Sequence, residues 1–134
     1  MIVVLCHGCF DLLHPGHVRH LEAARALGDR LVVSVTSDHF VGKGDGRPIF
    51  PLAQRMEMLR ALRCVDSVIR SPYETGGNNI LALRPNIFCK GVDYEGKQIH
   101  WAEWQACVAV GAKVACTQTE KFSTTEVIQK CASL

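Results

Sequence analysis

Short apolar runs alternate along the chain with stretches in which apolar residues recur every three or four positions. The runs are typical of buried strands, and the wider spacing is typical of amphipathic helices. The runs predict five strands, at residues 2–5, 31–35, 65–69, 86–89 and 113–116. The spaced stretches predict helices at 17–27, 51–62, 101–110 and 124–131, with a short helical turn at 80–83. Two polar, glycine-containing segments, residues 37–50 and 71–79, are expected to be loops.

Strands that alternate with helices in this way predict an α/β fold, in which a five-stranded parallel sheet is covered by helices on both faces. Such sheets bind ligands beyond the carboxyl ends of their strands. The loops that follow the strands are therefore the places to look for chemistry.

The bulk composition narrows the function classes. The chain has 134 residues, of which 48% are hydrophobic and 21% charged, and residues 1–134 are predicted to form one domain. A net charge of +2 does not indicate a nucleic-acid or membrane partner. No apolar run approaches the roughly 20 residues of a membrane helix, and the N-terminus does not resemble a signal peptide, so we expect a cytoplasmic protein.

Seven cysteines are present, and two of them, Cys6 and Cys9, have the spacing of a metal knuckle. A zinc site would need about two further ligands at matching spacing, and there is no second pair. We therefore expect reduced thiols and predict no metal site built from side chains.

The loop after the first strand, residues 7–17, carries His14 and His17 on either side of Pro15 and Gly16. A helix start offers unpaired N–H groups and partial positive charge, which suit phosphate, and Gly16 permits close approach. Two imidazoles three residues apart can both donate to phosphate oxygens, as charge stabilisation in phosphoryl-type transfer requires. One core histidine beside an exposed one, or a metal-binding pair, are the alternatives.

The string resembles the signature of the cytidylyltransferase-like branch of the HIGH nucleotidyltransferases, on Gly8-x-Phe10-Asp11-x-x-His14-x-Gly16-His17. The resemblance implies a Rossmann-like three-layer fold. It also implies that both histidines contact the triphosphate and are catalytic. The nucleotide would lie along Gly8, Cys9 and Phe10, and Asp11 would orient the acceptor or a metal.

The connection after the second strand places Lys43 among glycines, which suits a flexible loop that grips phosphate, although a solvated charged loop would look the same. Residues 43–55 are similar to the adenylyltransferase domain of bacterial bifunctional ADP-heptose synthases. The similarity implies that Lys43 contacts the phosphates and is catalytic, and that Arg55 helps to set the site from the next helix. Arg47 and Arg55 are expected to serve acceptor binding. The run before Lys43 lacks the further basic residues of relatives, which keeps a nucleotide-binding module without turnover as an alternative.

Two later segments complete the predicted nucleotide site. Residues 90–94 place an acid and an aromatic at a strand end, where they can read a base or ribose, or form a plain turn. Ser123 is predicted to cap the last helix, whose start can also bind phosphate. Both segments resemble those of the heptose-type enzymes, which implies nucleotide contacts from Lys90, Gly91, Asp93, Tyr94, Ser123, Thr124 and Thr125.

Taken with the resemblance, these motifs imply transfer of a nucleotidyl group from a nucleoside triphosphate, with ATP favoured, to a sugar phosphate such as heptose 1-phosphate. Pyrophosphate would leave, and Mg²⁺ would be held mainly by the substrate phosphates. A CTP-dependent glycerol-3-phosphate cytidylyltransferase and an FAD synthetase-like adenylyltransferase are the enzymatic alternatives. Relatives often dimerise, and the sequence leaves a homodimer open.

Overall fold

The computed structural model describes residues 1–91, 99–118 and 124–134. Its five strands are β1 (Val3–Gly8), β2 (Arg30–Thr36), β3 (Ser67–Ser71), β4 (Ile87–Lys90) and β5 (Lys113–Cys116). Its helices are α1 (Pro15–Arg25), α2 (Leu52–Arg60), α3 (Gly77–Leu83), α4 (Trp101–Val110) and α5 (Thr124–Ala132), with a 3₁₀ turn, η1, at Asp38–Phe40.

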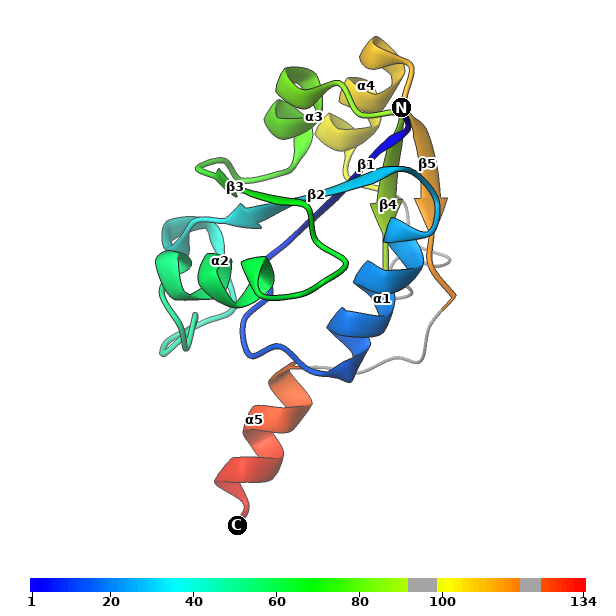
Figure 1. The fold of residues 1–134 in the computed structure, drawn as a ribbon. Coiled ribbons are helices and arrows are strands. Elements are labelled where there is room, and N and C mark those ends of the chain that lie inside the picture. The colour runs from blue at the N-terminus through cyan, green and yellow to red at the C-terminus, as the bar shows by residue number, and fades with distance from the viewer. Residues whose placement is uncertain (92–98, 119–123) are drawn as a thin grey trace.

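All strand pairs are parallel, and the strand order is β3-β2-β1-β4-β5 (Figure 1). Helices α1 and α2 cover one face of the sheet, and α3 and α4 pack together on the other (Figure 1). The predicted α/β, Rossmann-like three-layer fold with a five-stranded parallel sheet is therefore confirmed. From β1 the next two strands, β2 and β3, follow towards one edge of the sheet, whereas β4 and β5 follow towards the other edge. This change of order between β1 and β4 puts the expected ligand crevice beyond the carboxyl ends of these two strands.

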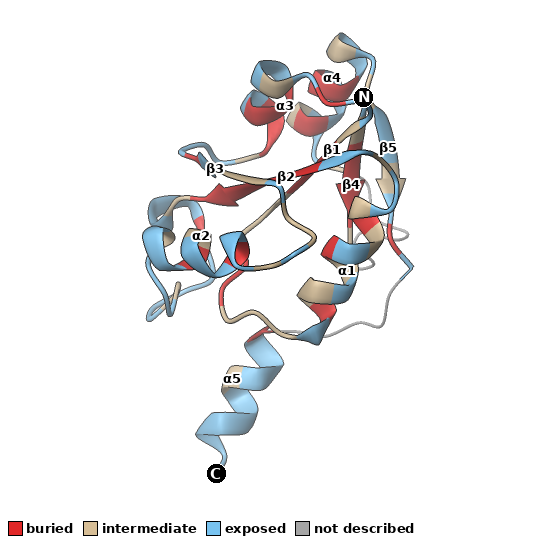
Figure 2. Ribbon diagram, viewed as in Figure 1, coloured by how far each residue is buried: buried red, intermediate tan, exposed pale blue. Residues whose placement is uncertain are grey.

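Alternation along the central strands builds a separate core on each face. Val4 and Cys6 of β1 pack towards α1 and α2, whereas Leu5 between them packs towards α3 and α4. All three side chains are fully buried, and Figure 2 shows the buried residues concentrated in the sheet and the inner helix faces. These two cores hold the carboxyl ends of the strands at fixed positions.

Several predicted boundaries move. Helix α1 begins at Pro15, two residues earlier than predicted, because His14 caps it and proline suits the first helical position. Residues 77–83, predicted as loop and short turn, form the full helix α3. Glycine suits position 77 because α3 and α4 lie close together there. A Cβ on Gly77 would lie 3.0 Å from the carbonyl oxygen of Ala102 in α4. The chain between β2 and α2 contains η1.

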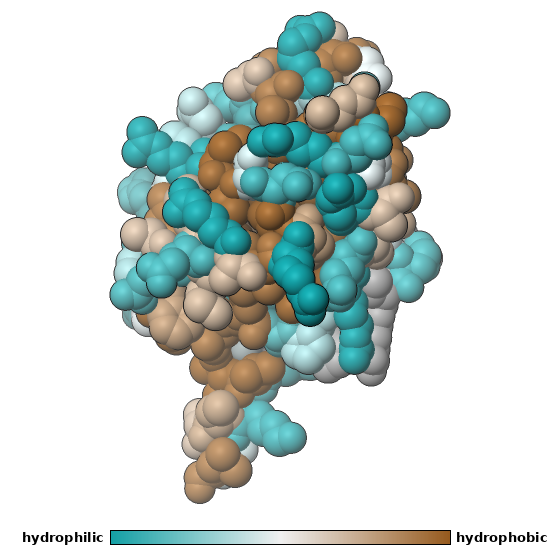
Figure 3. All heavy atoms as spheres, in the orientation of Figure 1, coloured by the Kyte–Doolittle hydropathy of each residue, from teal (hydrophilic) through white to brown (hydrophobic). Residues whose placement is uncertain are grey.

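Helix α5 extends away from the sheet and is largely exposed (Figures 1 and 2). Its first residue, Thr124, is buried and its Oγ1 donates to the carbonyl oxygen of Asp11 at 2.8 Å. Figure 3 shows hydrophobic residues at the surface where α5 meets the rest of the chain. Among the described residues, no helix has both the length and the apolar character that crossing a bilayer would need.

Candidate active site

The loop between β1 and α1 has an unusual backbone. Phe10 and Leu12 adopt φ values of 50° and 51°, in the left-handed region that non-glycine residues rarely occupy. Such conformations persist only where surrounding contacts hold them, and they concentrate at functional sites. These two left-handed residues lie between the end of β1 and the start of α1, where His14 occupies the helix N-cap.

His14 and His17 cap the helix reciprocally. The backbone N–H of His17 donates to Nδ1 of His14 at 3.3 Å, and the backbone N–H of His14 donates to Nδ1 of His17 at 3.2 Å. The two rings stack with centroids 3.8 Å apart and 20° between their planes. Because both Nδ1 atoms accept hydrogen bonds, each neutral ring carries its proton on Nε2. These backbone contacts thus fix the tautomer of a neutral ring at both positions.

The surroundings keep His17 neutral. Burial lowers its pKa to about 3, and the positive charges of His14, His20 and Lys43 act in the same direction, against the opposing charge of Asp11. His17 is therefore an uncharged hydrogen-bond donor at neutral pH, which fits a group that stabilises negative charge without giving up its proton.

A polar cleft of about 590 Å³ opens beyond the carboxyl ends of the strands, and His17 lines it. Eight other residues from the sequence prediction line the same cleft: Gly8, Cys9, Phe10, Asp11, Lys43, Lys90, Gly91 and Thr124. They come from the ends of β1 and β4, the loop after β2, and the start of α5. The fold thus brings together residues that are more than a hundred positions apart in the sequence.

Some predicted residues lie elsewhere. His14, Gly16, Arg47, Arg55 and Thr125 are not part of the cleft lining, although His14 stacks on His17. Asp93, Tyr94 and Ser123 fall outside the described residues.

Asp11 is held inside the protein. Only 2% of the residue is exposed, and its carboxylate accepts from the backbone N–H groups of Ile49 and Phe50, at 2.7 and 3.0 Å, and from Nε of Arg47 at 3.2 Å. Burial alone would raise the pKa of Asp11, but these hydrogen bonds and the Arg47 charge outweigh it and lower the pKa. The contacts favour a role in positioning the loop, in place of the predicted orientation of the acceptor.

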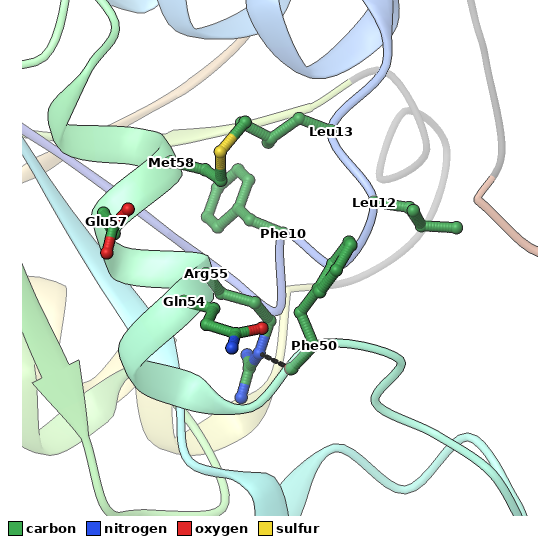
Figure 4. Close-up of a pocket in the computed structure, with 8 residues that line it drawn as sticks. All are labelled: Phe10, Leu12, Leu13, Phe50, Gln54, Arg55, Glu57 and Met58. Carbon is green, nitrogen blue, oxygen red and sulfur yellow. Dashed lines mark hydrogen bonds between the residues drawn. The ribbon is translucent and has the colours of Figure 1, made fainter.

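Arg55 of α2 needs the same correction. Its guanidinium donates to the carbonyl oxygens of Phe50 (2.9 Å) and Cys9 (2.8 Å) and pairs with Asp38 at 2.6 Å. Figure 4 shows the side chain against Phe50 in a smaller pocket of about 430 Å³ that Phe10 also lines. All three guanidinium nitrogens are thus engaged within the chain, which favours support of the β1–α1 loop over the predicted acceptor contact.

Arg47 differs from Arg55 because one of its donors is left over. Its Nε pairs with Asp11, and Nη1 donates to Oγ1 of Thr125 at 3.4 Å. Its Nη2 is buried and has no hydrogen-bond partner within the described part of the chain. A buried donor without a partner is costly, and it marks a place where a ligand oxygen would be stabilised.

Sequence reasoning missed a second set of polar residues that lines the cleft on the α3 and α4 side. His7 at the end of β1 binds Ser34 through Nδ1 at 2.8 Å, and burial lowers its pKa to about 4. Glu103 of α4 is 3% exposed and pairs with Lys90 at 2.7 Å. The signals were present in the sequence, because His7 directly precedes the motif and Glu103 is a lone acid in an otherwise apolar stretch.

His20 was missed as well. It stands one helical turn after His17 and lines the cleft, with its Nδ1 2.7 Å from Oγ1 of Thr117. No group of three or more histidine, cysteine or acidic side chains that could hold a metal ion occurs among residues 1–91, 99–118 and 124–134.

The parallel α/β sheet, with the uncharged imidazole of His17 in the crevice beyond its strand ends, suits the binding of a ligand that carries phosphate. The family model described as cytidylyltransferase-like matches residues 5–130. The chain belongs to the cytidylyltransferase-like family and is a nucleotidyltransferase.

Individual relatives agree with this assignment. The chain is 48% identical over 132 residues to the bifunctional protein HldE of Hydrogenovibrio crunogenus, an alignment that covers 96% of this chain and 27% of the relative. It is 54% identical over 94 residues to HldE of Methylococcus capsulatus, which covers 69% of this chain and 20% of the relative. The chain thus spans about a quarter of the length of the curated relatives that it matches.

Solved structures give the same fold. The lipopolysaccharide core biosynthesis protein of Thermoplasma volcanium superposes with a TM-score of 0.75 at 30% identity, covering 90% of this chain and 99% of that one. Pantothenate synthetase of Thermus thermophilus, at 16% identity and a TM-score of 0.58, shares the fold over 94% of this chain and 58% of its own.

Proposed function

We propose that the protein transfers the adenylyl group of ATP to a sugar phosphate, with heptose 1-phosphate as the favoured acceptor. An oxygen of the acceptor phosphate attacks the α-phosphorus, and a new P–O bond forms. The bond between the α-phosphorus and the bridging oxygen breaks, and pyrophosphate leaves with the electron pair. No side chain acts as a nucleophile in this reaction, so catalysis consists of positioning and charge stabilisation.

The reciprocally capped pair of His14 and His17 is the observation that carries the proposal. Both Nδ1 atoms are occupied by backbone N–H groups, so Nε2 is the nitrogen that remains for the other contacts of each ring. The lowered pKa of His17 keeps its ring neutral near pH 7, so Nε2–H stays the donor and Nδ1 stays the acceptor. An imidazole N–H beside a helix N-terminus suits the oxygens of a triphosphate whose charge grows as pyrophosphate departs.

Basic side chains around the cleft would hold the remaining phosphate oxygens. Lys43 lies on the cleft wall and is exposed, so it can reach both the donor and the acceptor phosphates. Arg47 lies outside the cleft lining, and its buried Nη2 lacks a protein partner among the described residues, so a phosphate oxygen would satisfy it only after the side chain moved towards the cleft. Arg47 also contacts Thr125 at the start of α5, where the N–H groups of a first helical turn suit phosphate.

The preference for ATP and a sugar phosphate rests on the likeness to the heptose-type enzymes. Lys90 and Gly91 of the Lys-Gly-Val-Asp-Tyr string line the cleft next to the end of β4, consistent with a place beside the nucleotide. The identity with HldE relatives over nearly the whole chain supports the same subgroup. We further propose that Asp93 and Tyr94 contact the base or ribose, and that Ser123 contacts phosphate.

Mg²⁺ is proposed as the cofactor, held mainly by substrate phosphates. Asp11 is a poor ligand because its carboxylate already accepts three hydrogen bonds from the protein. When bound to the triphosphate, the ion would offset negative charge.

Pyrophosphate release with Mg²⁺ tests the proposal. ATP or CTP is offered with heptose 1-phosphate, other sugar 1-phosphates, glycerol 3-phosphate and flavin mononucleotide, and each mixture is repeated without acceptor. We expect the fastest release from ATP with a sugar 1-phosphate. Faster turnover of CTP with glycerol 3-phosphate, or of ATP with flavin mononucleotide, would replace the proposed substrates. Tight triphosphate binding with no release from any acceptor would indicate a binding module.

A further inference from the structure

Glu103 joins three elements at the inner end of the cleft. Its Oε1 pairs with Nζ of Lys90, at the end of β4, at 2.7 Å. Its Oε2 accepts from the backbone N–H of Gly76, directly before α3, at 2.8 Å. The side chains of Glu103 and Lys90 are 4% and 6% exposed, so solvent does not screen this pair. One carboxylate thus ties a strand end, a helix start and its own helix α4 together.

The surroundings of Gly76 show how closely this cluster is packed. A Cβ on Gly76 would lie 2.9 Å from Cγ of His7, a distance that real Cβ atoms essentially never show, and 3.0 Å from Oε2 of Glu103, which is tighter than most real Cβ contacts. His7 is itself held by Ser34 on β2. The carboxylate, the glycine and the imidazole therefore fit one another without room for an extra methyl group.

Stability alone does not account for a buried ion pair at this place. Two buried charges lose their hydration, and the attraction between them often does no more than offset this loss. An apolar pair of similar volume would extend the neighbouring core, which already contains Phe88, Ala106 and Cys107. The ammonium of Lys90 instead stands over the ring of Phe88, 4.8 Å from its centroid, and on the wall of the cleft.

We propose that Glu103 is a positioning residue, which fixes the ammonium of Lys90 for the nucleotide and sets the wall at Glu74 and Thr75 through its bond to Gly76. This inference rests on the proposed function, in which Lys90 contacts the nucleotide. Glu74 and Thr75 line the cleft immediately before the tethered glycine. Without Glu103 the ammonium would lose this buried ion pair, and the nucleotide would lose an oriented contact and not a reacting group.

A double-mutant cycle tests this role. Glutamine in Glu103→Gln keeps an oxygen for the N–H of Gly76 but turns an NH₂ group towards Lys90. ATP affinity is measured by isothermal titration calorimetry for the wild type, Glu103→Gln, Lys90→Met and the double variant. We expect Glu103→Gln to weaken ATP binding at least about tenfold, the scale of a hydrogen bond to a charged group. The double variant should bind ATP as Lys90→Met does, within about twofold, because the two residues act as one unit.

Turnover and melting temperature separate positioning from general damage. We expect the kcat of Glu103→Gln to stay within about threefold of the wild type, because the histidine pair is untouched. Glu22→Gln, on the exposed surface of α1, is the matched control and should change neither quantity. If Glu103→Gln does not fold, Gly76→Ala probes the same cluster by displacing the carboxylate, and it should also weaken ATP binding only while Lys90 is present.

The outcomes distinguish the two proposals. Additive losses in the double variant, or a fall in kcat with unchanged ATP affinity, would overturn the role of Glu103 and leave the proposed function standing. A wild type that binds ATP but transfers it to no acceptor would overturn the proposed function, and the binding cycle would still decide the role of Glu103. A wild type that binds neither ATP nor CTP would overturn both.

Discussion

Replacing His17 tests the central claim about this site, because the residue has two separable roles. Its Nδ1 caps the first turn of α1, and its Nε2–H is the proposed donor to the triphosphate. His17→Ala removes both roles. His17→Gln keeps the first, because glutamine at the third helical position accepts from the N-cap N–H in an ordinary capping box.

The expected magnitudes differ for the two roles. Loss of a cap costs about 0.5–2 kcal/mol of stability. In a domain of this size 1 kcal/mol corresponds to a shift in Tm of roughly 3–5 °C. Loss of one preorganised donor to a charge that develops in the transition state lowers kcat by about 10²–10³. We therefore expect His17→Ala to lose both stability and turnover, and His17→Gln to recover Tm while kcat stays at least about 100-fold low.

The assay is pyrophosphate release at saturating substrates, paired with a calorimetric measurement of Tm for each variant. Turnover of His17→Ala near the wild-type level would refute the proposed chemistry. Recovery of kcat together with Tm in His17→Gln would show that the residue acts only as a helix cap.

Further predictions follow from other contacts. Burial lowers the pKa values of His17 and His7 to about 3 and 4, so between these values and about 6.5 the unfolded chain binds protons that the folded chain does not. Stability should therefore fall as the pH is lowered from 7 towards 4.5, and it should fall less steeply in His17→Gln. Thermal melts across this pH range measure both slopes. Arg55→Lys should lower the free energy of unfolding, measured by urea titration, by at least about 2 kcal/mol. Lysine cannot serve the three acceptors that the buried guanidinium reaches. Lys43→Met should lower turnover at least about tenfold while Tm moves by less than about 2 °C, because this side chain is exposed and lies on the cleft wall.

The elements that the sequence predicted well are those with local signals. The bounds of α4 and β5 match the prediction, and α4 ends where Gly111 takes a left-handed φ of 73°, as the glycine indicated. The start of α1 was missed because histidine is not a usual N-cap residue. Helix α3 was missed because glycine and asparagine disfavour helices locally, while packing against α4 decided the outcome.

The roles of charged residues were harder to predict than their presence near the site. Asp11 and Arg55 stand in or beside the motifs, and the family resemblance led to the prediction that both serve acceptor binding. In the structure Asp11 binds the backbone of Ile49 and Phe50, which are 38 and 39 positions away. Nothing local in the sequence distinguishes a carboxylate that serves such distant N–H groups from one that faces a substrate. Glu103 stood out locally as a lone acid, but its partners, Lys90 and Gly76, only become neighbours in the fold.

The contacts around the β1–α1 loop explain how the histidine pair can be ready before any substrate binds. Left-handed conformations at Phe10 and Leu12 cost about 1–3 kcal/mol each and need support. Arg55 supplies it at the carbonyl of Cys9, and Thr124 supplies it at the carbonyl of Asp11. The loop is thus held from α2 on one side and from α5 on the other, while His14 and His17 fix each other. A donor held in this way loses little further freedom when the triphosphate arrives, so its hydrogen bond can stabilise developing charge.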